Sequence, residues 1–241
     1  MKFHFLLPSI KGIPVLMYHR VMPDEQDGLT VSTIQLREQW SYLKEQGYTS
    51  LSLEEFYERA IGNIKSNGKE VLLTFDDGYY NNMVHMKPLL EEFDFHATIF
   101  LIADAIAAHE KPTYEGLMTT DDLKQFDSNK VSFGLHGFHH ENFKETSLVN
   151  LKEAITKSIA VFKENNIKYY PAIAYPFGAR PEGILKQWMK SQGIKMAFRI
   201  GNQPAKVPAK DLFEIKRIDI RGTDSLNDFI IKLKKGKLKP F

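Results

Sequence analysis

Residues 71–78 read VLLTFDDG, an apolar run that ends in two adjacent aspartates and a glycine. Such a run predicts a buried strand of a parallel sheet, and active-site groups gather at the carboxyl ends of parallel strands. Two neighbouring carboxylates are costly to bury unless a cation or a proton lies close to them. Asp76 and Asp77 therefore predict a metal or catalytic site at the end of this strand.

A second segment supplies further ligands for such a site. Residues 134–140 read GLHGFHH and place His136 and His140 four positions apart after another apolar stretch. A helical turn there would bring both imidazoles onto one face. Two imidazoles and one carboxylate leave an open coordination position, as in catalytic zinc sites. One aspartate can then bind the metal while its neighbour acts as a general base on a water activated by the metal.

The rest of the chain predicts an α/β fold. Apolar runs alternate with helical patterns, which indicates parallel strands joined by crossover helices. About seven such units favour a closed, distorted TIM-like (β/α)7 barrel over an open sheet. We expect one domain over residues 1–241, and residues 103–125 to form a long loop over one barrel face. The expected strands are Pro14–His19, Glu70–Phe75, His96–Ile102, Val131–His136, Ala172–Phe177, Lys195–Ile200 and Phe213–Ile220. The expected helices are Thr33–Gln46, Ser52–Ala60, Tyr80–Phe93, Ser147–Asn165, Pro181–Gln192 and Ser225–Leu233, the second with a capping box of Ser52 and Glu55.

Composition excludes several other classes of protein. The 241 residues are 43% hydrophobic and carry a net charge of +2, which is too small to indicate a nucleic-acid partner. The lysines from Lys232 to Lys239 are expected to form a solvated terminus. The chain has no cysteine, so a metal must be held by His, Asp, Glu or water. The apolar start Phe3–Pro8 is too short for an export signal and no run is long enough for a membrane span, so we expect a cytoplasmic protein.

The two motifs together resemble those of the polysaccharide deacetylases, the NodB-like enzymes of carbohydrate esterase family 4. Residues 74–78 resemble the first motif and residues 136–140 the second. The resemblance implies that Asp76 is the catalytic base and that Asp77, His136 and His140 are the metal ligands. Residues 175–178 resemble the third motif. The resemblance therefore implies that Tyr175, Pro176 and Phe177 line the substrate groove and that the Phe177 amide helps to hold the oxyanion.

Two departures from the family pattern concern the remaining catalytic groups. The arginine that usually precedes the third motif and orients the base is missing, and Arg180, Arg199 and Arg217 are the candidates to replace it. The histidine that acts as general acid usually ends the last strand, but no histidine follows His140.

The first expected strand ends in His19, and the first and last strands of a closed barrel are neighbours. The order of motifs is then permuted, as in the poly-N-acetylglucosamine deacetylases, which this chain resembles most. That resemblance implies that His19 is the general acid and that Met17 packs against the acetyl group.

The resemblance implies a metal-dependent hydrolase that removes N-acetyl groups from an N-acetylated saccharide and releases acetate. Zinc is the expected ion, although two histidines and one carboxylate also suit Co²⁺, Ni²⁺ or Fe²⁺. Two alternatives remain open at this point. The same fold could hydrolyse O-acetyl esters or non-sugar amides, or the protein could bind carbohydrate without catalysis.

Overall fold

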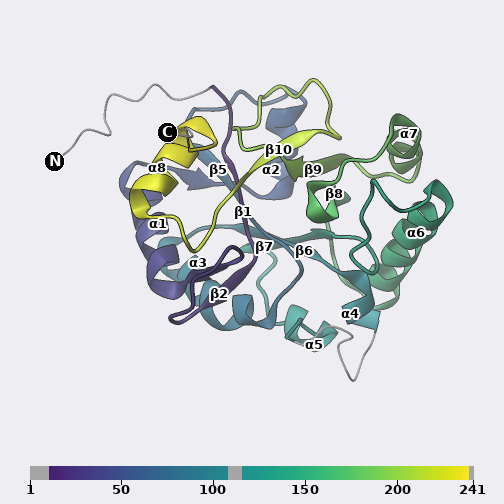
Figure 1. The fold of residues 1–241 in the computed structure, drawn as a ribbon, viewed down its shortest axis with the longest axis horizontal. Helices are drawn as coiled ribbons and strands as arrows, with labels where there is room; N and C mark the ends of the chain where they lie inside the picture. Colours follow the sequence, from purple (N-terminus) through teal and green to yellow (C-terminus); the bar gives the residue numbers. More distant parts are fainter. Residues whose placement is uncertain (1–10, 108–115, 239–241) are drawn as a thin grey trace.

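Seven parallel strands form a closed barrel in the computed structural model, which describes residues 11–107 and 116–238 (Figure 1). Their order around the barrel is β1-β10-β9-β8-β7-β6-β5, and a second pairing of β1 with β5 closes the ring. The expected barrel is thereby confirmed. The strands are β1 (Val15–Tyr18), β5 (Glu70–Phe75), β6 (Ala97–Leu101), β7 (Val131–Leu135), β8 (Ala172–Ala174), β9 (Met196–Ile200) and β10 (Ile215–Asp219).

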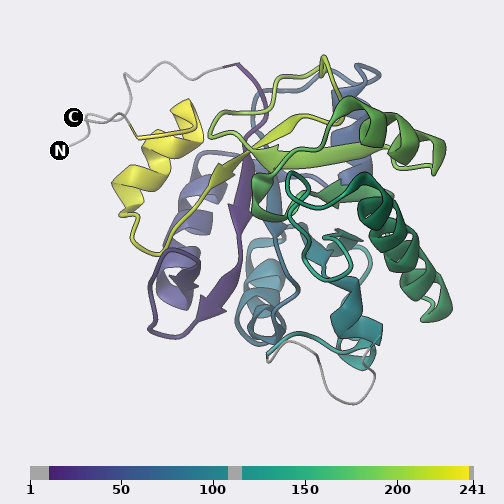
Figure 2. The same cartoon turned by 45° about the vertical axis from the view of Figure 1, so that its right-hand side comes forward.

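Helices surround the barrel, as the two views show (Figures 1 and 2). Helices α1, α2, α6 and α8 each begin at a serine whose side chain accepts a backbone N–H of the first turn, and the expected capping box of Ser52 and Glu55 is present. The helices are α1 (Thr33–Glu45), α2 (Leu53–Ala60), α3 (Lys87–Phe93), α4 (Ala103–Ala107), α5 (Thr120–Leu123), α6 (Leu148–Glu164), α7 (Gly183–Ser191) and α8 (Leu226–Lys235). Shorter elements are β2 (Arg20–Met22), β3 (Thr30–Ser32), β4 (Thr49–Ser50), a π-helical turn η2 (Asn82–Met86) and a 3-10 turn η3 (Pro176–Gly178).

Alternate residues of the strands belong to two apolar clusters. On β1, Val15 belongs to the cluster that includes α2, whereas Leu16 belongs to the larger cluster that includes α1. Residues near the amino ends of several strands pack with Phe56 of α2, so this helix covers that end of the barrel. The carboxyl ends of the strands are left for the polar residues described below.

The structure departs from several sequence-based expectations about elements. Within residues 103–125, expected to be a loop, the described part contains the short helices α4 and α5. The strand expected to reach Phe177 ends at Ala174, because Pro176 and a left-handed Phe177 turn the backbone into η3.

The lysine-rich end is also different from the expectation. Lys232, Lys234 and Lys235 lie on helix α8, and Lys232 is buried rather than solvated. Lys239 and the segment Phe3–Pro8 lie outside the described residues. No helix among the described residues has the length and apolarity to cross a bilayer.

Candidate metal centre and catalytic cavity

Asp76 and Asp77 follow β5 directly and take different directions. The Asp76 N–H donates to the Tyr18 carbonyl of β1 at 3.0 Å, so the strand pairing continues to the first aspartate. The backbone then turns through positive φ at Asp77 and Gly78. This turn lets Asp76 face β10 while Asp77 faces the segment after β7. The two neighbours thus have different main partners, and His136 Nε2 lies within 4 Å of both, at 3.8 Å from Asp76 Oδ2 and 3.3 Å from Asp77 Oδ1.

His136 and His140 lie on the segment after β7, and this segment is not a helical turn as expected. Positive φ at Gly137 (82°) and at His140 (60°) reverses the chain instead. The carboxylate of Glu141 accepts the N–H groups of Phe138 and His139 at 2.9 Å and so holds the reversal. The two imidazole rings nevertheless come together, with their centroids 4.9 Å apart.

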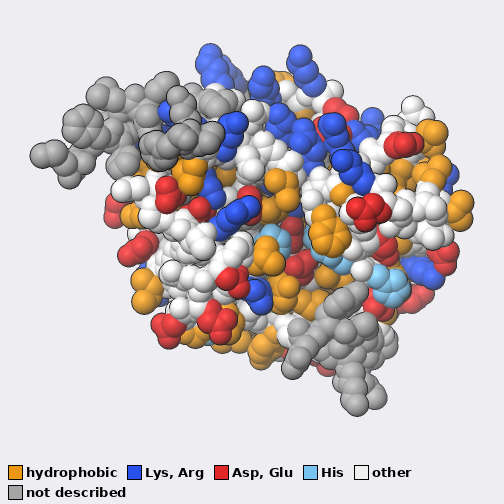
Figure 3. All heavy atoms as spheres, in the orientation of Figure 1, with side chains coloured by type: hydrophobic (Ala, Val, Ile, Leu, Met, Phe, Trp, Pro, Cys, Tyr) orange, Lys and Arg blue, Asp and Glu red, His pale blue; other side chains and the backbone are white. Residues whose placement is uncertain are grey.

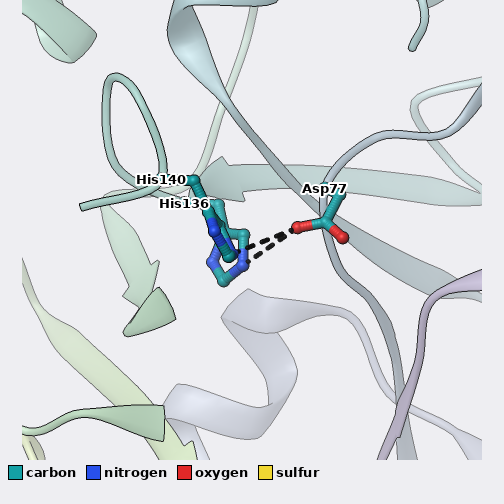
Figure 4. Close-up of side chains that lie close together, drawn as sticks. All are labelled: Asp77, His136 and His140. Carbon is teal, nitrogen blue, oxygen red and sulfur yellow. Dashed lines mark ion pairs between the residues drawn. The ribbon is translucent and has the colours of Figure 1, made fainter. Parts of the chain in front are cut away.

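Asp77, His136 and His140 form a three-donor cluster (Figure 4). Asp77 Oδ1 lies 3.3 Å from His136 Nε2 and 3.5 Å from His140 Nε2. A tetrahedral ion with bonds of about 2.0–2.1 Å separates its ligand atoms by roughly 3.4 Å, so the spacing fits such an ion. Asp77 Oδ1 is buried and has no donor in hydrogen-bond geometry among the described residues. A buried acceptor without a donor is accounted for by a cation, so the cluster can hold a divalent metal.

The surroundings prepare the imidazoles as ligands. His136 Nδ1 lies 2.9 Å from the Ala174 carbonyl, which fixes the proton on Nδ1 and leaves Nε2 free to bind a metal. Burial and the neighbouring His136 lower the pKa of His140 and keep its ring neutral. Burial lowers the pKa of His136 as well, but the carboxylates of Asp76 and Asp77 outweigh it and raise that pKa. Protons therefore compete with a metal at His136.

Arg217 is the partner of Asp76. Its two terminal nitrogens each donate to one carboxylate oxygen at 2.6 Å, and both side chains are buried. Burial alone raises the pKa of Asp76, but the positive charges of Arg217 and His136 outweigh it and hold that pKa below its usual range. The other two candidates, Arg180 and Arg199, pair with Glu214 instead. The bidentate pair fixes the plane of the Asp76 carboxylate.

His19 ends the stretch that begins with β1, and its position follows from the closure of the barrel. Strand β1 lies between β5 and β10, so the expectation that the first and last strands are neighbours is confirmed. His19 Nε2 lies 4.0 Å from Asp76 Oδ2, and the ring lines the same cavity as the metal cluster. Met17 lines this cavity too.

The third motif divides between the core and the cavity. Phe177 lies on the cavity wall, 63% exposed, with its ring centroid 4.5 Å from that of His140. The expectation that Tyr175 and Pro176 line the groove is not met, because both are buried. The Tyr175 hydroxyl donates to the Phe213 carbonyl at 3.2 Å, so its polar end is satisfied within the core.

One cavity of about 450 Å³ lies at the carboxyl ends of the strands. Its wall includes the residues assigned above to the site, namely Met17, His19, Asp76, Asp77, His136, His140, Phe177 and Arg217. In Figure 3, histidine side chains are visible near the middle of the face, among apolar and acidic ones. Sequence reasoning missed two charged residues of the wall, Asp219 and Arg221. The only signal for them was their place at the end of the last expected strand.

Comparison with known proteins identifies similar chains. Residues 63–197 match the family model described as polysaccharide deacetylase. The chain is 26% identical over 174 residues to YxkH of Bacillus subtilis (strain 168), assigned to the polysaccharide deacetylases, and the match covers 72% of this chain and 60% of YxkH. It is 34% identical over 88 residues to the poly-beta-1,6-N-acetyl-D-glucosamine N-deacetylase of Escherichia coli (strain K12), covering 36% and 13% of the two chains.

The chain thus spans less than two thirds of either relative. Among solved structures, the deacetylase PplD of Streptococcus pyogenes, in complex with acetate, superimposes with a TM-score of 0.80 at 23% identity. The match covers 93% of this chain and 99% of PplD. At this identity the likeness concerns the fold.

Proposed function

Because the chain belongs to the polysaccharide deacetylase family, we propose that it is a metal-dependent hydrolase that removes N-acetyl groups from a saccharide and releases acetate. The observation that carries the proposal is the meeting of three groups of side chains in one cavity: the donor cluster of Asp77, His136 and His140, the Asp76–Arg217 pair, and His19. Amide hydrolysis requires electrophilic activation, a base and an acid, and each group supplies one of them.

Asp77, His136 and His140 are the proposed metal ligands. Two imidazole nitrogens and one carboxylate oxygen suit Zn²⁺ best, with Co²⁺, Ni²⁺ and Fe²⁺ as further candidates. A divalent ion bound there supplies Lewis acidity, which polarises the acetyl carbonyl and lowers the pKa of water.

Asp76 is the proposed general base. It is ionised because Arg217 and His136 stabilise the carboxylate, and it lies next in sequence to a metal ligand without joining the cluster. Arg217 occupies one hydrogen-bonding position on each carboxylate oxygen, so the remaining lone pairs keep a fixed direction toward the cavity. A base held in this way accepts the proton of the attacking water without first reorganising.

His19 is the proposed general acid. It lines the cavity that holds the metal cluster and lies 4.0 Å from Asp76, so both proton-transfer groups can reach one reacting amide. When the tetrahedral intermediate collapses, His19 gives a proton to the amine nitrogen as the C–N bond breaks and acetate leaves. Phe177 and Met17 line the cavity. The Phe177 backbone amide is the proposed second stabiliser of the oxyanion, and Met17 is the proposed apolar surface for the acetyl methyl group.

We propose a glucosamine-based substrate. The Escherichia coli relative is named for its action on a poly-β-1,6-linked N-acetylglucosamine, and the motif order of this chain places His19 ahead of the aspartates. A cavity open at the surface, with an exposed aromatic ring of Phe177 on its wall, suits a saccharide that extends beyond the reacting unit.

An acetate-release screen tests this function. The protein is stripped of metal, reloaded with Zn²⁺, and incubated with β-linked N-acetylglucosamine oligomers, acetylated xylan and cyclic ureides. We expect zinc-dependent acetate release from the glucosamine oligomers. Release from acetylated xylan alone would replace the proposal with an esterase, and ring opening of a ureide would replace it with an amidohydrolase. Zinc-loaded protein that binds oligomers and never releases acetate would leave only carbohydrate binding.

A further inference from the structure

Two charged side chains on the cavity wall take no part in the proposed reaction. Arg221 Nε donates to Asp219 Oδ2 at 2.7 Å, and both residues line the cavity that holds the metal cluster. The Asp219 side chain is 14% exposed and the Arg221 side chain 57%, so the pair reaches from the wall to the mouth of the cavity. Neither residue is a proposed metal ligand, base or acid.

A buried polar network holds the segment that carries this pair. Lys232 of α8 donates to the Asp219 carbonyl at 2.9 Å and to the Asp224 carboxylate at 2.5 Å. The same carboxylate accepts the Arg221 N–H at 2.8 Å. Gln35 of α1 donates to the carbonyls of Arg221 (3.3 Å), Gly222 (3.1 Å) and Asp224 (2.6 Å).

Lys232, Asp224 and Gln35 are all buried. A buried lysine–aspartate pair that is hydrogen-bonded to the surrounding backbone restrains that backbone. Two helices thus hold the loop after β10 in one conformation, and the pair is presented on a rigid support.

The chemistry of the pair fits neutral sugar hydroxyls. One edge of the guanidinium is used by Asp219, and the charges of the two groups cancel. Among residues 11–107 and 116–238, no group donates to Asp219 Oδ1 or accepts from the terminal nitrogens of Arg221. The Asp219 Oδ1 acceptor and the terminal N–H donors of Arg221 are therefore both available on one pair of side chains. Two adjacent hydroxyls, each of which can donate and accept, complement this arrangement.

We propose that Asp219 and Arg221 bind a pair of adjacent hydroxyls on the saccharide and so select its linkage, an inference that rests on the proposed function for the class of ligand. A β-1,6-linked N-acetylglucosamine unit keeps its 3- and 4-hydroxyls free and adjacent. An internal β-1,4-linked unit has lost the 4-hydroxyl to the glycosidic bond. The pair therefore favours the first linkage over the second.

Calorimetric binding of two hexamers, β-1,6-linked and β-1,4-linked N-acetylglucosamine, tests this inference. Every protein compared is zinc-loaded and carries Asp76→Asn so that it does not turn over the hexamers, and the wild type here is the protein with that change alone. The test variant is Arg221→Ala. The matched control is Arg180→Ala, since Arg180 is an equally exposed arginine (59%) paired with an acid, Glu214, outside the cavity. We expect the wild type to prefer the β-1,6 hexamer, and Arg221→Ala to weaken that binding about tenfold while leaving the β-1,4 hexamer within about twofold. Arg180→Ala should change neither affinity.

The inference is overturned if Arg221→Ala leaves the β-1,6 affinity unchanged, if it weakens both hexamers equally, or if the wild type binds neither. Unchanged circular dichroism and zinc content of the variant separate loss of the pair from loss of fold. Because the Asp76→Asn background binds the hexamers without turning them over, and acetate release is measured separately on the protein that keeps Asp76, a failure of the proposed function is distinguishable. Preference for the β-1,6 hexamer without acetate release would reject deacetylation and leave the role of the pair standing.

Discussion

At the scale of single residues, two identical neighbours acquire different chemistry from their partners alone. Asp76 is buried against the guanidinium of Arg217, whereas Asp77 presents an unpaired oxygen to two imidazoles. The role of each aspartate is therefore set by the side chains around it and not by the aspartate itself. A carboxylate locked by a cation is an oriented proton acceptor, and one facing two imidazole nitrogens is a metal ligand.

The buried Asp76–Arg217 pair predicts that removing Arg217 alone destabilises the fold, and that neutralising Asp76 as well restores most of the lost stability. Arg217→Met leaves a buried carboxylate without its cation and should lower the free energy of unfolding by about 3–5 kcal/mol. Adding Asp76→Asn removes the buried charge, so the double variant should regain most of that stability without regaining activity. Urea unfolding of the metal-free proteins measures both. Equal stability of the single and double variants would contradict the coupling.

His19 predicts a loss of turnover without a loss of metal. His19→Ala should lower kcat about 10²–10⁴-fold, the usual contribution of a general acid, with the zinc content unchanged. His85→Ala is the control, because His85 lies on η2 and does not line the cavity. A His19→Ala protein that turns over normally, or one that has lost its zinc, would remove the proposed role.

At the scale of elements, the segment after β7 shows why backbone conformation matters to the metal cluster. Gly137 has φ 82°, and a Cβ there would lie 2.6 Å from Glu141 Oε2, the atom that accepts the Phe138 N–H. A side chain at this position therefore strains the backbone and displaces the carboxylate that holds the reversal. His140 depends on that reversal for its place beside His136.

Gly137→Ala is expected to weaken zinc binding by an order of magnitude or more and to destabilise the fold by about 1–3 kcal/mol. Gly47→Ala is the matched control, since Gly47 has a similar φ of 74° but nothing within 4 Å of an added Cβ. It should show the backbone strain alone and bind zinc normally. Zinc affinities by competition with a chromogenic chelator decide the matter, and equal affinities of the two variants would contradict the account.

The sequence predicted elements better than it predicted partners. Each barrel strand was expected because its apolar run is local, and the two motifs were expected because their ligands follow those runs directly. Arg217 could not be ranked above Arg180 and Arg199, because its meeting with Asp76 depends on β1 lying between β5 and β10. Tyr175 was misplaced for a similar reason, since its hydroxyl bonds to a carbonyl 38 residues away.

At the scale of the whole molecule, closure of the barrel assembles the site. Strands β5, β7, β10 and β1 each deliver part of it at their carboxyl ends: the base and one ligand follow β5, the two histidine ligands follow β7, Arg217 lies on β10 and His19 follows β1. The metal cluster joins the ends of β5 and β7, so a bound ion is a crosslink within the barrel.

Zinc should therefore stabilise the folded chain. At about 1,000 times the dissociation constant the gain is roughly 4 kcal/mol, which for a chain of this size corresponds to a rise in Tm of about 10 °C. His140→Ala removes one ligand and should abolish the rise. Calorimetry with and without a chelator measures it, and a zinc-induced rise that persists in His140→Ala would place the ion elsewhere.

The most direct test of the central claim is the stoichiometry of acetate released from a β-1,6-linked N-acetylglucosamine hexamer by three preparations: metal-free protein, the same protein reloaded with zinc, and zinc-loaded Asp76→Asn. The account predicts no release by the first, release matched one to one by new free amines in the second, and a rate lowered by at least about 10² in the third, with zinc still bound. Acetate release that survives metal removal, or that Asp76→Asn leaves unchanged, would contradict it.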